Sequence, residues 1–237
     1  MDEVAALLRR AIADGQVKVG EHFPSEREMA SQLGVGRLVV REAIRSLESS
    51  GLIKVKRGIN GGCFVREATP DDVSRSFSNL LHMARISLQD LLEVRLGFET
   101  AIISTAIQRA SASDLKKIKE NVDDARSLAK GGPTEQLRVK FDEFHALLAE
   151  STHNPLFSML SVSILDIVNQ YMNALRYTSI VSLKTVKEHE EIYRYLAKRD
   201  ASNAIQSVCE HIKEDNRRFA SRAKRENLQS ILYLPQS

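Results

Sequence analysis

Apolar positions recur at helical spacing over most of this 237-residue chain and alternate as in a strand over very little of it. The first amphipathic helix is expected over residues 2–14, with four apolar side chains on one face: Val4, Leu7, Leu8 and Ile12. Two further helices are expected at about residues 25–33 and 37–50. Two short strands, at about residues 52–56 and 63–66, follow around a glycine-rich loop. Helix, tight turn, helix and hairpin together are typical of a winged helix-turn-helix domain.

The helix over residues 37–50 has two chemically different faces. Its apolar face consists of Val40, Ala43, Ile44 and Leu47. A second face, about 110° away around the helix axis, carries an arginine at every fourth position: Arg37, Arg41 and Arg45. A guanidinium group pairs bidentately with guanine or with a phosphate, so this face is suited to DNA. The alternative is a solvated charged face, but the preceding glycine turn and the basic hairpin favour DNA.

Beyond residue 68 the pattern changes to helices alone. Thr69 and Pro70 are typical of a helix start, and no convincing strand follows them. Helices are expected at about residues 70–84, 87–109, 113–130, 134–152, 154–179, 182–198 and 201–224, with one of the breaks at residues 179–182. The predicted fold is therefore mainly α. A winged helix-turn-helix domain in residues 1–68 is followed by an all-α bundle of six or seven helices in residues 69–237.

Charge is unevenly distributed along the chain. The whole chain has a formal charge of +3, whereas residues 25–66 alone carry eight basic and four acidic side chains. The remainder is therefore slightly acidic, as expected when a DNA-binding domain is joined to a body that does not bind DNA. Cys63 and Cys209 lie outside any metal-binding spacing, which indicates free thiols in a reducing compartment. With no secretory signal and no apolar run near the ~20 residues of a membrane span, we expect a cytoplasmic protein without membrane contact.

Three motifs of the N-terminal region carry a resemblance to a known family. They are P-S-E-R-E-M-A, G-V-G-R-L-V-V-R-E-A-I-R-S-L-E-S-S-G-L-I and R-G-I-N-G-G-C-F-V. With its surroundings, about residues 4–65, this region resembles the DNA-binding domain of GntR-family transcription regulators. The resemblance implies DNA contacts from Arg27, Arg37, Arg41, Arg57 and Gly58, and Arg45 joins them as the third arginine of the stripe. The family usually has Ser or Thr where this chain has Gly36, and often a small or hydroxyl residue where it has Leu38, so we expect an altered operator preference.

The helical region resembles the ligand-binding domain of the FadR subfamily, called the FCD domain, over about residues 72–222. The matching motifs are E-V-R-L-G-F-E, F-H-A-L-L-A-E-S-T-H-N-P-L, E-H-E-E-I-Y-R-Y-L-A-K-R-D-A-S-N-A and E-H-I-K. Many members bind a divalent metal through three histidines and one aspartate, and here the histidines fall on His145, His189 and His211. The usual aspartate position holds Phe141, so Asp142, one residue further on, is the candidate fourth ligand. Such a site would suit Zn, Ni, Co or Mn.

The leading hypothesis is a transcription regulator that responds to a metabolite and is not an enzyme. It would bind a pseudo-palindromic operator on double-stranded DNA as a homodimer, while the helical domain dimerises and holds a small carboxylic acid. Arg95 would meet the carboxylate of this effector, although Arg95 and Glu99 could equally form an ordinary ion pair along one helix. One alternative is a metal-dependent enzyme in the bundle, which the absence of an H-E-x-x-H or comparable motif disfavours. Another is a DNA-binding protein without a ligand, which the length of the helical region disfavours.

Overall fold

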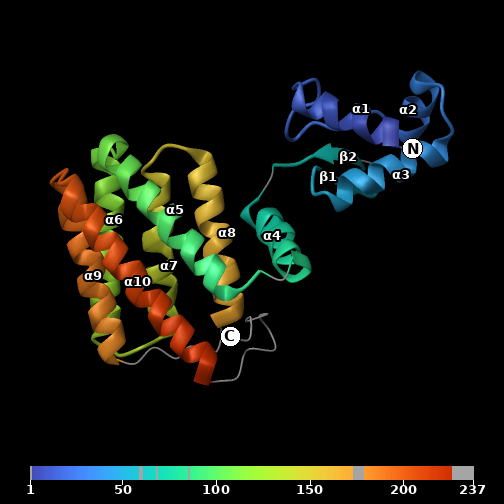
Figure 1. Ribbon diagram of the computed structural model, residues 1–237. Coiled ribbons are helices and arrows are strands. Elements are labelled where there is room, and N and C mark those ends of the chain that lie inside the picture. Colours follow the sequence, from blue (N-terminus) through green and yellow to red (C-terminus); the bar gives the residue numbers. More distant parts are fainter. Residues whose placement is uncertain (1, 59–60, 68, 85, 173–178, 226–237) are drawn as a thin grey trace. The chain divides into compact units, whose positions relative to one another are not determined.

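The computed structural model describes residues 2–58, 61–67, 69–84, 86–172 and 179–225 (Figure 1). The chain divides into two compact units, Met1–Asp72 and Val73–Ser237, which we call the head and the body. Within the described residues there are ten helices and one two-stranded sheet. The mainly helical fold predicted from the sequence is therefore confirmed.

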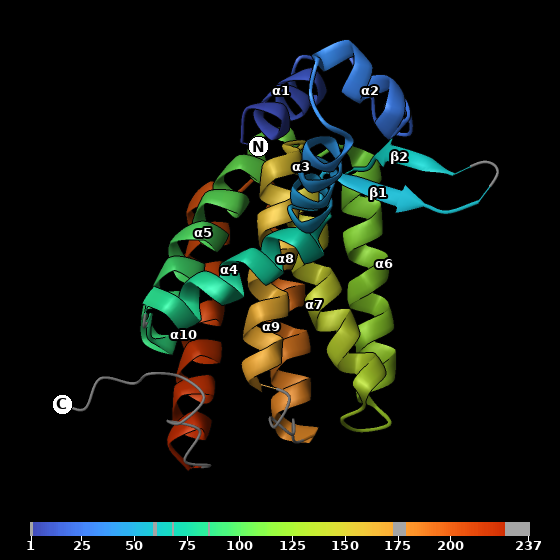
Figure 2. The ribbon, with the colours of Figure 1, turned by 90° about the vertical axis from the view of Figure 1, so that its right-hand side faces the viewer.

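The head has the predicted order of helix, helix-turn-helix and hairpin. Its elements are α1 (Asp2–Ala13), α2 (Glu26–Leu33), α3 (Arg37–Ser49), β1 (Ile53–Lys56) and β2 (Gly62–Val65). The two strands pair antiparallel, with Ile53 opposite Val65. Figure 2 shows this hairpin projecting beyond the three helices, as the wing of a winged helix-turn-helix does.

Local sequence explains where the helix-turn-helix begins and turns. Ser25 and Glu28 form a capping box at the start of α2, in which each side chain accepts a hydrogen bond from the other residue's backbone N–H. Gly34 ends α2 with φ +65°, a left-handed conformation that favours glycine. Gly36 precedes α3 without a side-chain cap, as expected from the missing hydroxyl group.

The head core is built on the predicted apolar face of α3. Val40, Ala43, Ile44 and Leu47 are all buried there. The prediction for α1 was wrong at Leu7, whose side chain is exposed. The buried face of α1 is centred among Val4, Ala5 and Leu8, and Leu7 lies about 110° from that centre at helical spacing.

The body is a helical bundle of seven helices within the described residues. They are α4 (Pro70–Ala84), α5 (Leu88–Arg109), α6 (Ala112–Ala129), α7 (Glu135–Glu150), α8 (Pro155–Met172), α9 (Ser179–Ala197) and α10 (Ala201–Arg225). These helices confirm the predicted segments, except that residues 173–178 of the fifth lie outside the described residues. The break expected at residues 179–182 was wrong, because α9 already begins at Ser179. Ser182 is fully buried within that helix.

Capping boxes and a shared core fix the long helices of the body. Ser87 with Asp90 and Ser111 with Asp114 cap the starts of α5 and α6. α5 packs along α10, α9 packs on α6 and α10, and α7 packs on α5, α6, α8 and α9. Large apolar side chains, among them Phe144 and Leu196, are fully buried between these helices. This packing brings the middle turns of α5, α7, α9 and α10 to one place, where several polar side chains are also buried. Among the described residues, no helix is both long enough and apolar enough to cross a lipid bilayer.

Candidate functional site

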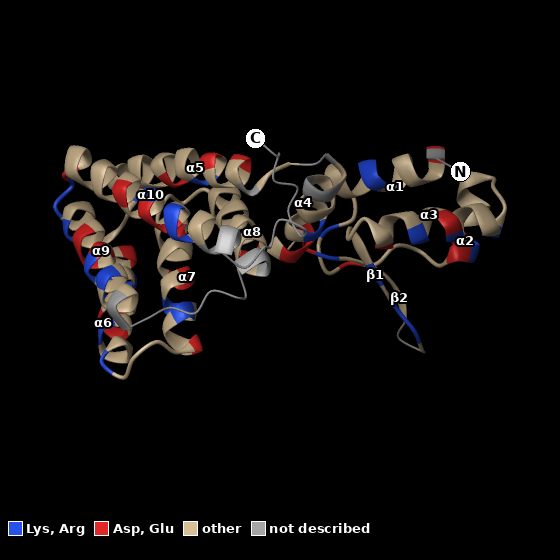
Figure 3. Cartoon of the chain, turned by 60° about the horizontal axis from the view of Figure 1, so that its bottom comes forward, with Lys and Arg blue, Asp and Glu red and all other residues tan. Residues whose placement is uncertain are grey.

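The head exposes every residue that the sequence assigned to DNA. Arg37, Arg41 and Arg45 follow one another along the solvent side of α3, and Arg27, Arg57 and Gly58 are exposed on α2 and after β1. Figure 3 shows basic segments on α3 and along the hairpin. Leu38 is 70% exposed beside these arginines, so an apolar side chain is also offered at this surface. An exposed second helix that presents guanidinium groups has the chemistry of a recognition helix.

Two arginines of α3 have acidic partners within the head. Arg41 donates to Glu26 of α2 from Nε, at 3.2 Å from Oε2, and from Nη2, at 2.9 Å from Oε2. Arg45 Nη1 donates to Glu42 Oε1 at 2.7 Å within α3 itself. The Arg41 pair joins two helices, and the side-chain hydrogen bond to Glu26 raises the pKa of Arg41. The guanidinium group of Arg41 is therefore oriented before any DNA is bound.

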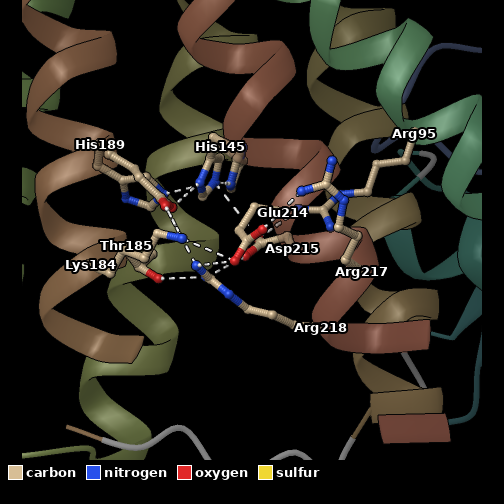
Figure 4. Close-up of polar contacts among 11 residues, drawn as sticks. Arg95, His145, Lys184, Thr185, His189, Glu214, Asp215, Arg217 and Arg218 are labelled. Atoms are coloured by element: carbon tan, nitrogen blue, oxygen red, sulfur yellow. Dashed lines mark hydrogen bonds and ion pairs between the residues drawn. The ribbon is translucent and has the colours of Figure 1, made fainter. Parts of the chain in front are cut away.

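In the body, three buried histidines from three helices converge. His145 lies on α7, His189 on α9 and His211 on α10, and each is less than 5% exposed. His211 Nε2 is 3.3 Å from His145 Nε2 and 3.2 Å from His189 Nε2. Figure 4 labels His145 and His189 of this group. Within the part of the chain that the structure describes, these three residues form the group whose ligand atoms all lie within 4.8 Å of one another.

The distances from His211 to the other two histidines fit a metal ion. Zn–N bonds of about 2.0–2.1 Å in a tetrahedral arrangement place neighbouring nitrogens about 3.3 Å apart. Carboxylates also lie against the outer nitrogens: Glu188 Oε2 is 2.8 Å from His211 Nδ1, and Glu99 Oε1 is 3.2 Å from His145 Nδ1. At His211 the Glu188 carboxylate keeps the proton on Nδ1 and leaves the Nε2 lone pair free for a metal.

Charge and burial also favour the metal-binding form of the histidines. Burial, followed by the nearby charges of His211, His145 and Arg95, holds the pKa of His189 well below its usual value. His189 is therefore neutral at pH 7, as a metal ligand must be. Burial opposes ionisation of Glu99, but His145 and Arg95 outweigh it and lower the pKa of Glu99. A buried carboxylate thus remains available to orient His145.

Asp142, the expected fourth metal ligand, does not lie with the three histidines. The ring of Phe141 lies edge-on to His189, with ring centroids 5.4 Å apart, so an apolar group occupies that side of the cluster. Asp142 Oδ2 accepts from Asn169 Nδ2 at 3.0 Å and pairs with Arg138 Nη1 at 3.2 Å. The carboxylate of Asp142 is outside the group formed by the three histidines, because these two neighbours hold it elsewhere.

Arg95 lies beside the histidine cluster and is 2% exposed. Its Nη2 is 3.7 Å from Asp215 Oδ2, while Nε and Nη1 have no hydrogen-bond partner among the described residues. Arg95, His145, His189 and Asp215 all line one cavity of about 20 Å³, together with Asp142. The predicted effector residue and the predicted metal ligands are thus brought together.

Sequence reasoning missed Asp215. This residue is 6% exposed on α10, and its Oδ2 lies 3.7 Å from His211 Nε2. Figure 4 shows Arg95 and Arg218 approaching it from two directions, and Arg218 Nη1 is 3.2 Å from its Oδ1. The signal was present in the sequence, since Asp215 follows His211 by four residues and so shares its helix face.

Comparison with known families decides the class of protein. Residues 1–65 match the family described as bacterial regulatory proteins, gntR family, and residues 90–214 match the FCD domain. The chain belongs to the GntR family. The resemblance found in the sequence is confirmed, and this GntR-family protein is a transcription regulator with a DNA-binding helix-turn-helix domain and an FCD domain.

Several relatives of this GntR-family regulator are similar over most of their length. HTH-type transcriptional regulator LutR of Bacillus subtilis (strain 168) is 28% identical over 207 residues, which cover 85% of this chain and 92% of LutR. The Uxu operon transcriptional regulator of Escherichia coli (strain K12) is 30% identical over 224 residues, which cover 92% of this chain and 85% of that regulator. The galactonate operon transcriptional repressor of the same strain is 25% identical over 224 residues, covering 92% and 96%.

A solved structure shares the fold. Streptococcus agalactiae GntR superposes with a TM-score of 0.67 at 22% identity, covering 91% of this chain and 98% of that one. At this identity the likeness concerns the fold alone. The matched families and named relatives are transcription regulators rather than enzymes, which confirms that expectation and removes the support for an enzyme in the bundle.

Proposed function

We propose that this GntR-family regulator binds a pseudo-palindromic operator as a homodimer, in the cytoplasm, and that a small carboxylic acid bound in the body changes its affinity for that operator. The observation that carries the proposal is that Arg95 lines one cavity with His145 and His189, whose imidazole rings group with that of His211. A cationic side chain with two nitrogens that lack a hydrogen-bond partner among the described residues is costly to bury among apolar helices. An anion in the cavity would satisfy both nitrogens.

A divalent metal ion is the second part of the proposed site. His145, His189 and His211 would hold it through Nε2, and Zn, Ni, Co and Mn all suit imidazole ligands to different degrees. The ion would supply a positive charge that attracts a carboxylate oxygen. Arg95 would bind the acid from the other side of the cavity, so the acid would be oriented by two positive groups.

The effector class follows from the chemistry of the cavity walls. Two positive centres, the metal and Arg95, suit a carboxylate, while Thr185 and Asn169 offer polar groups to a hydroxyl. One relative is named for the galactonate operon, so hydroxylated acids such as galactonate are the first candidates to test. The cavity of about 20 Å³ holds no more than an ion or a water molecule, so binding of an acid requires the lining helices to move apart.

This required movement supports control of the head by the body. A ligand shifts an equilibrium only when its affinity differs between the two arrangements, and a cavity that must open provides such a difference. α4 is the connecting element: Asp72 in its first turn pairs with Arg66 of the head, while Ser74 donates to Asp166 of α8 in the body. A shift of α4 could therefore change the head arrangement without unfolding either unit.

The homodimer and the operator form belong together in this proposal. A winged helix-turn-helix reads a short half-site, and a symmetric operator requires a two-fold symmetric protein. The proposed function is tested by selecting a duplex from a random library with the full-length protein and titrating it with and without a panel of small acids. We expect one acid to change the operator affinity about 5- to 150-fold. No response to any acid, at saturating metal, would leave a ligand-independent DNA-binding protein as the better account.

A further inference from the structure

The three histidines alone leave the charge of a bound metal uncompensated. Neutral imidazoles add no negative charge, so a divalent ion would keep both positive charges inside an apolar bundle, which is costly. Glu99 and Glu188 do not solve this as ligands, because both face Nδ1 atoms on the far sides of the rings. Before an acid is bound, a carboxylate of the protein on the Nε2 side of the cluster would offset this charge.

We infer that Asp215 is a direct carboxylate ligand of the metal, together with His145, His189 and His211. This inference rests on the metal site in the proposed function and adds a ligand to it. Asp215 Oδ2 lies 3.7 Å from His211 Nε2, and that nitrogen is the one closest to both other histidines. His211 and Asp215 are four residues apart on α10, so one turn of helix presents both toward the same point.

The distance between Asp215 Oδ2 and His211 Nε2 needs only a small adjustment for both atoms to bind one metal ion. Zn–N bonds of about 2.0–2.1 Å and Zn–O bonds of about 2.0–2.2 Å in a tetrahedral site place the nitrogen and the oxygen about 3.4 Å apart. The observed 3.7 Å to His211 is a few tenths of an ångström longer. Asp215 lies outside the group of three histidines whose ligand atoms are all within 4.8 Å of one another, so its side chain must also rotate toward His145 and His189. The other oxygen, Oδ1, is already held by Arg218 Nη1 at 3.2 Å. Arg218 thus fixes the carboxylate while Oδ2 faces both His211 Nε2 and Arg95 Nη2, each at 3.7 Å.

Asp142 is the competing carboxylate, and its contacts argue against it. Its Oδ2 is shared between Asn169 at 3.0 Å and Arg138 at 3.2 Å, so coordination through this oxygen would require both contacts to break. Phe141, the residue before it, places an aromatic ring against His189 on the α7 side. Asp215 from α10 therefore supplies the negative charge that α7 does not.

The variants Asp215→Asn and Asp142→Asn form a matched pair for testing this assignment. Both remove one negative charge near the cavity and keep the side-chain volume. The full-length protein is stripped with a chelator and titrated with Co²⁺ in buffer free of carboxylic acids, by calorimetry and by visible absorption. We expect Asp215→Asn to weaken Co²⁺ binding at least 10-fold and to change the absorption spectrum of the bound ion. We expect Asp142→Asn to stay within about 2-fold of the parent, since it loses no ligand.

A crystal structure of the Zn²⁺-loaded parent protein completes the test and does not depend on the folding of any variant. We expect an Asp215 oxygen about 2.0–2.2 Å from the zinc ion. Zinc bound by the histidines with Asp215 beyond 3 Å, or parent-like Co²⁺ binding by Asp215→Asn, would overturn the inference while leaving the metal site intact. A parent protein that binds no metal at all would instead overturn the metal part of the proposed function, and this inference with it.

Discussion

Glu26 of α2 and Arg41 of α3 form an ion pair across the helix-turn-helix, with 2.9 Å between Oε2 and Nη2. Glu26 takes hydrogen bonds from the Nε and Nη2 edge of the guanidinium group. The Nη1 nitrogen is not used in this pair, so it remains available to a guanine base. The pair thus fixes how Arg41 is presented at the surface of the head.

Replacement of Arg41 by alanine tests the recognition helix. If Arg41 contacts guanine bidentately, Arg41→Ala should cost about 1–3 kcal/mol of operator binding and relax the preference at one base pair. Arg27→Ala or Arg57→Ala should instead weaken binding to all sequences alike and lower the salt dependence, as a lost phosphate contact does. Fluorescence titration of the selected operator and of single-base variants distinguishes these outcomes. Operator binding by Arg41→Ala as tight as in the parent would refute the assignment.

Replacement of Glu26 by glutamine tests the orienting role of the ion pair. Glu26→Gln removes a negative charge from the DNA-facing surface, so binding to unrelated DNA should become tighter. The ratio between operator and unrelated DNA should fall, because Arg41 is no longer held in one orientation. Glu42→Gln is the matched control, because it removes the same charge but releases Arg45 of α3 instead of Arg41. A specificity ratio that falls equally in both variants would show that charge, rather than orientation, is responsible.

The body is predicted to carry most of the dimer contact. A fragment of residues 72–237 should fold, because its long helices form a core of their own, and it should remain dimeric at micromolar concentration if the body carries the contact. Light scattering of the full chain and of this fragment measures both masses. If the full chain is dimeric and the fragment is monomeric, the head makes the main dimer contact and the prediction is wrong.

The affinity for the metal is predicted to decrease as the pH is lowered. Imidazole binds a metal only when neutral, so protons compete with the ion as the pH drops through about 6.5, the unperturbed value for histidine. His189 should compete least, because burial lowers its pKa and its neutral form persists to lower pH. Calorimetric titration with Zn²⁺ at pH 7.5, 6.5 and 5.5 checks the direction. An affinity that is constant over this range would exclude the histidines as ligands.

The positions of the helices could be predicted from the sequence because interactions between residues close in sequence determine where each helix begins and ends. Ser25 and Ser87 cap helices by hydrogen bonds within three residues, and Gly34 allows a left-handed turn, so local residues determine where helices start and stop. Leu7 shows the limit of this approach. Its spacing fits an apolar face, but the partner helices decide which face is buried.

The residues of the candidate site could be predicted from the sequence only in part. Helical spacing alone does not bring His145, His189 and His211 together, since they lie on three helices, and their expected meeting came from the family resemblance. Asp215 follows His211 by four residues in the sequence, but the family resemblance places the acidic ligand on α7, so the sequence did not single out Asp215. The nearly closed cavity depends on how side chains of five helices fit together, which no local pattern encodes.

The central claim is tested most directly by titrating the operator with the parent protein and with Arg95→Ala. Both proteins are loaded with metal, and both are measured with and without the acid found in the panel. The claim is that an acid bound at Arg95 changes DNA affinity. The parent is predicted to change its operator affinity about 5- to 150-fold when the acid is added, a coupling of about 1–3 kcal/mol. Arg95→Ala is predicted to show no change, and its thermal unfolding confirms that the variant is folded. An equal response of both proteins would contradict the account.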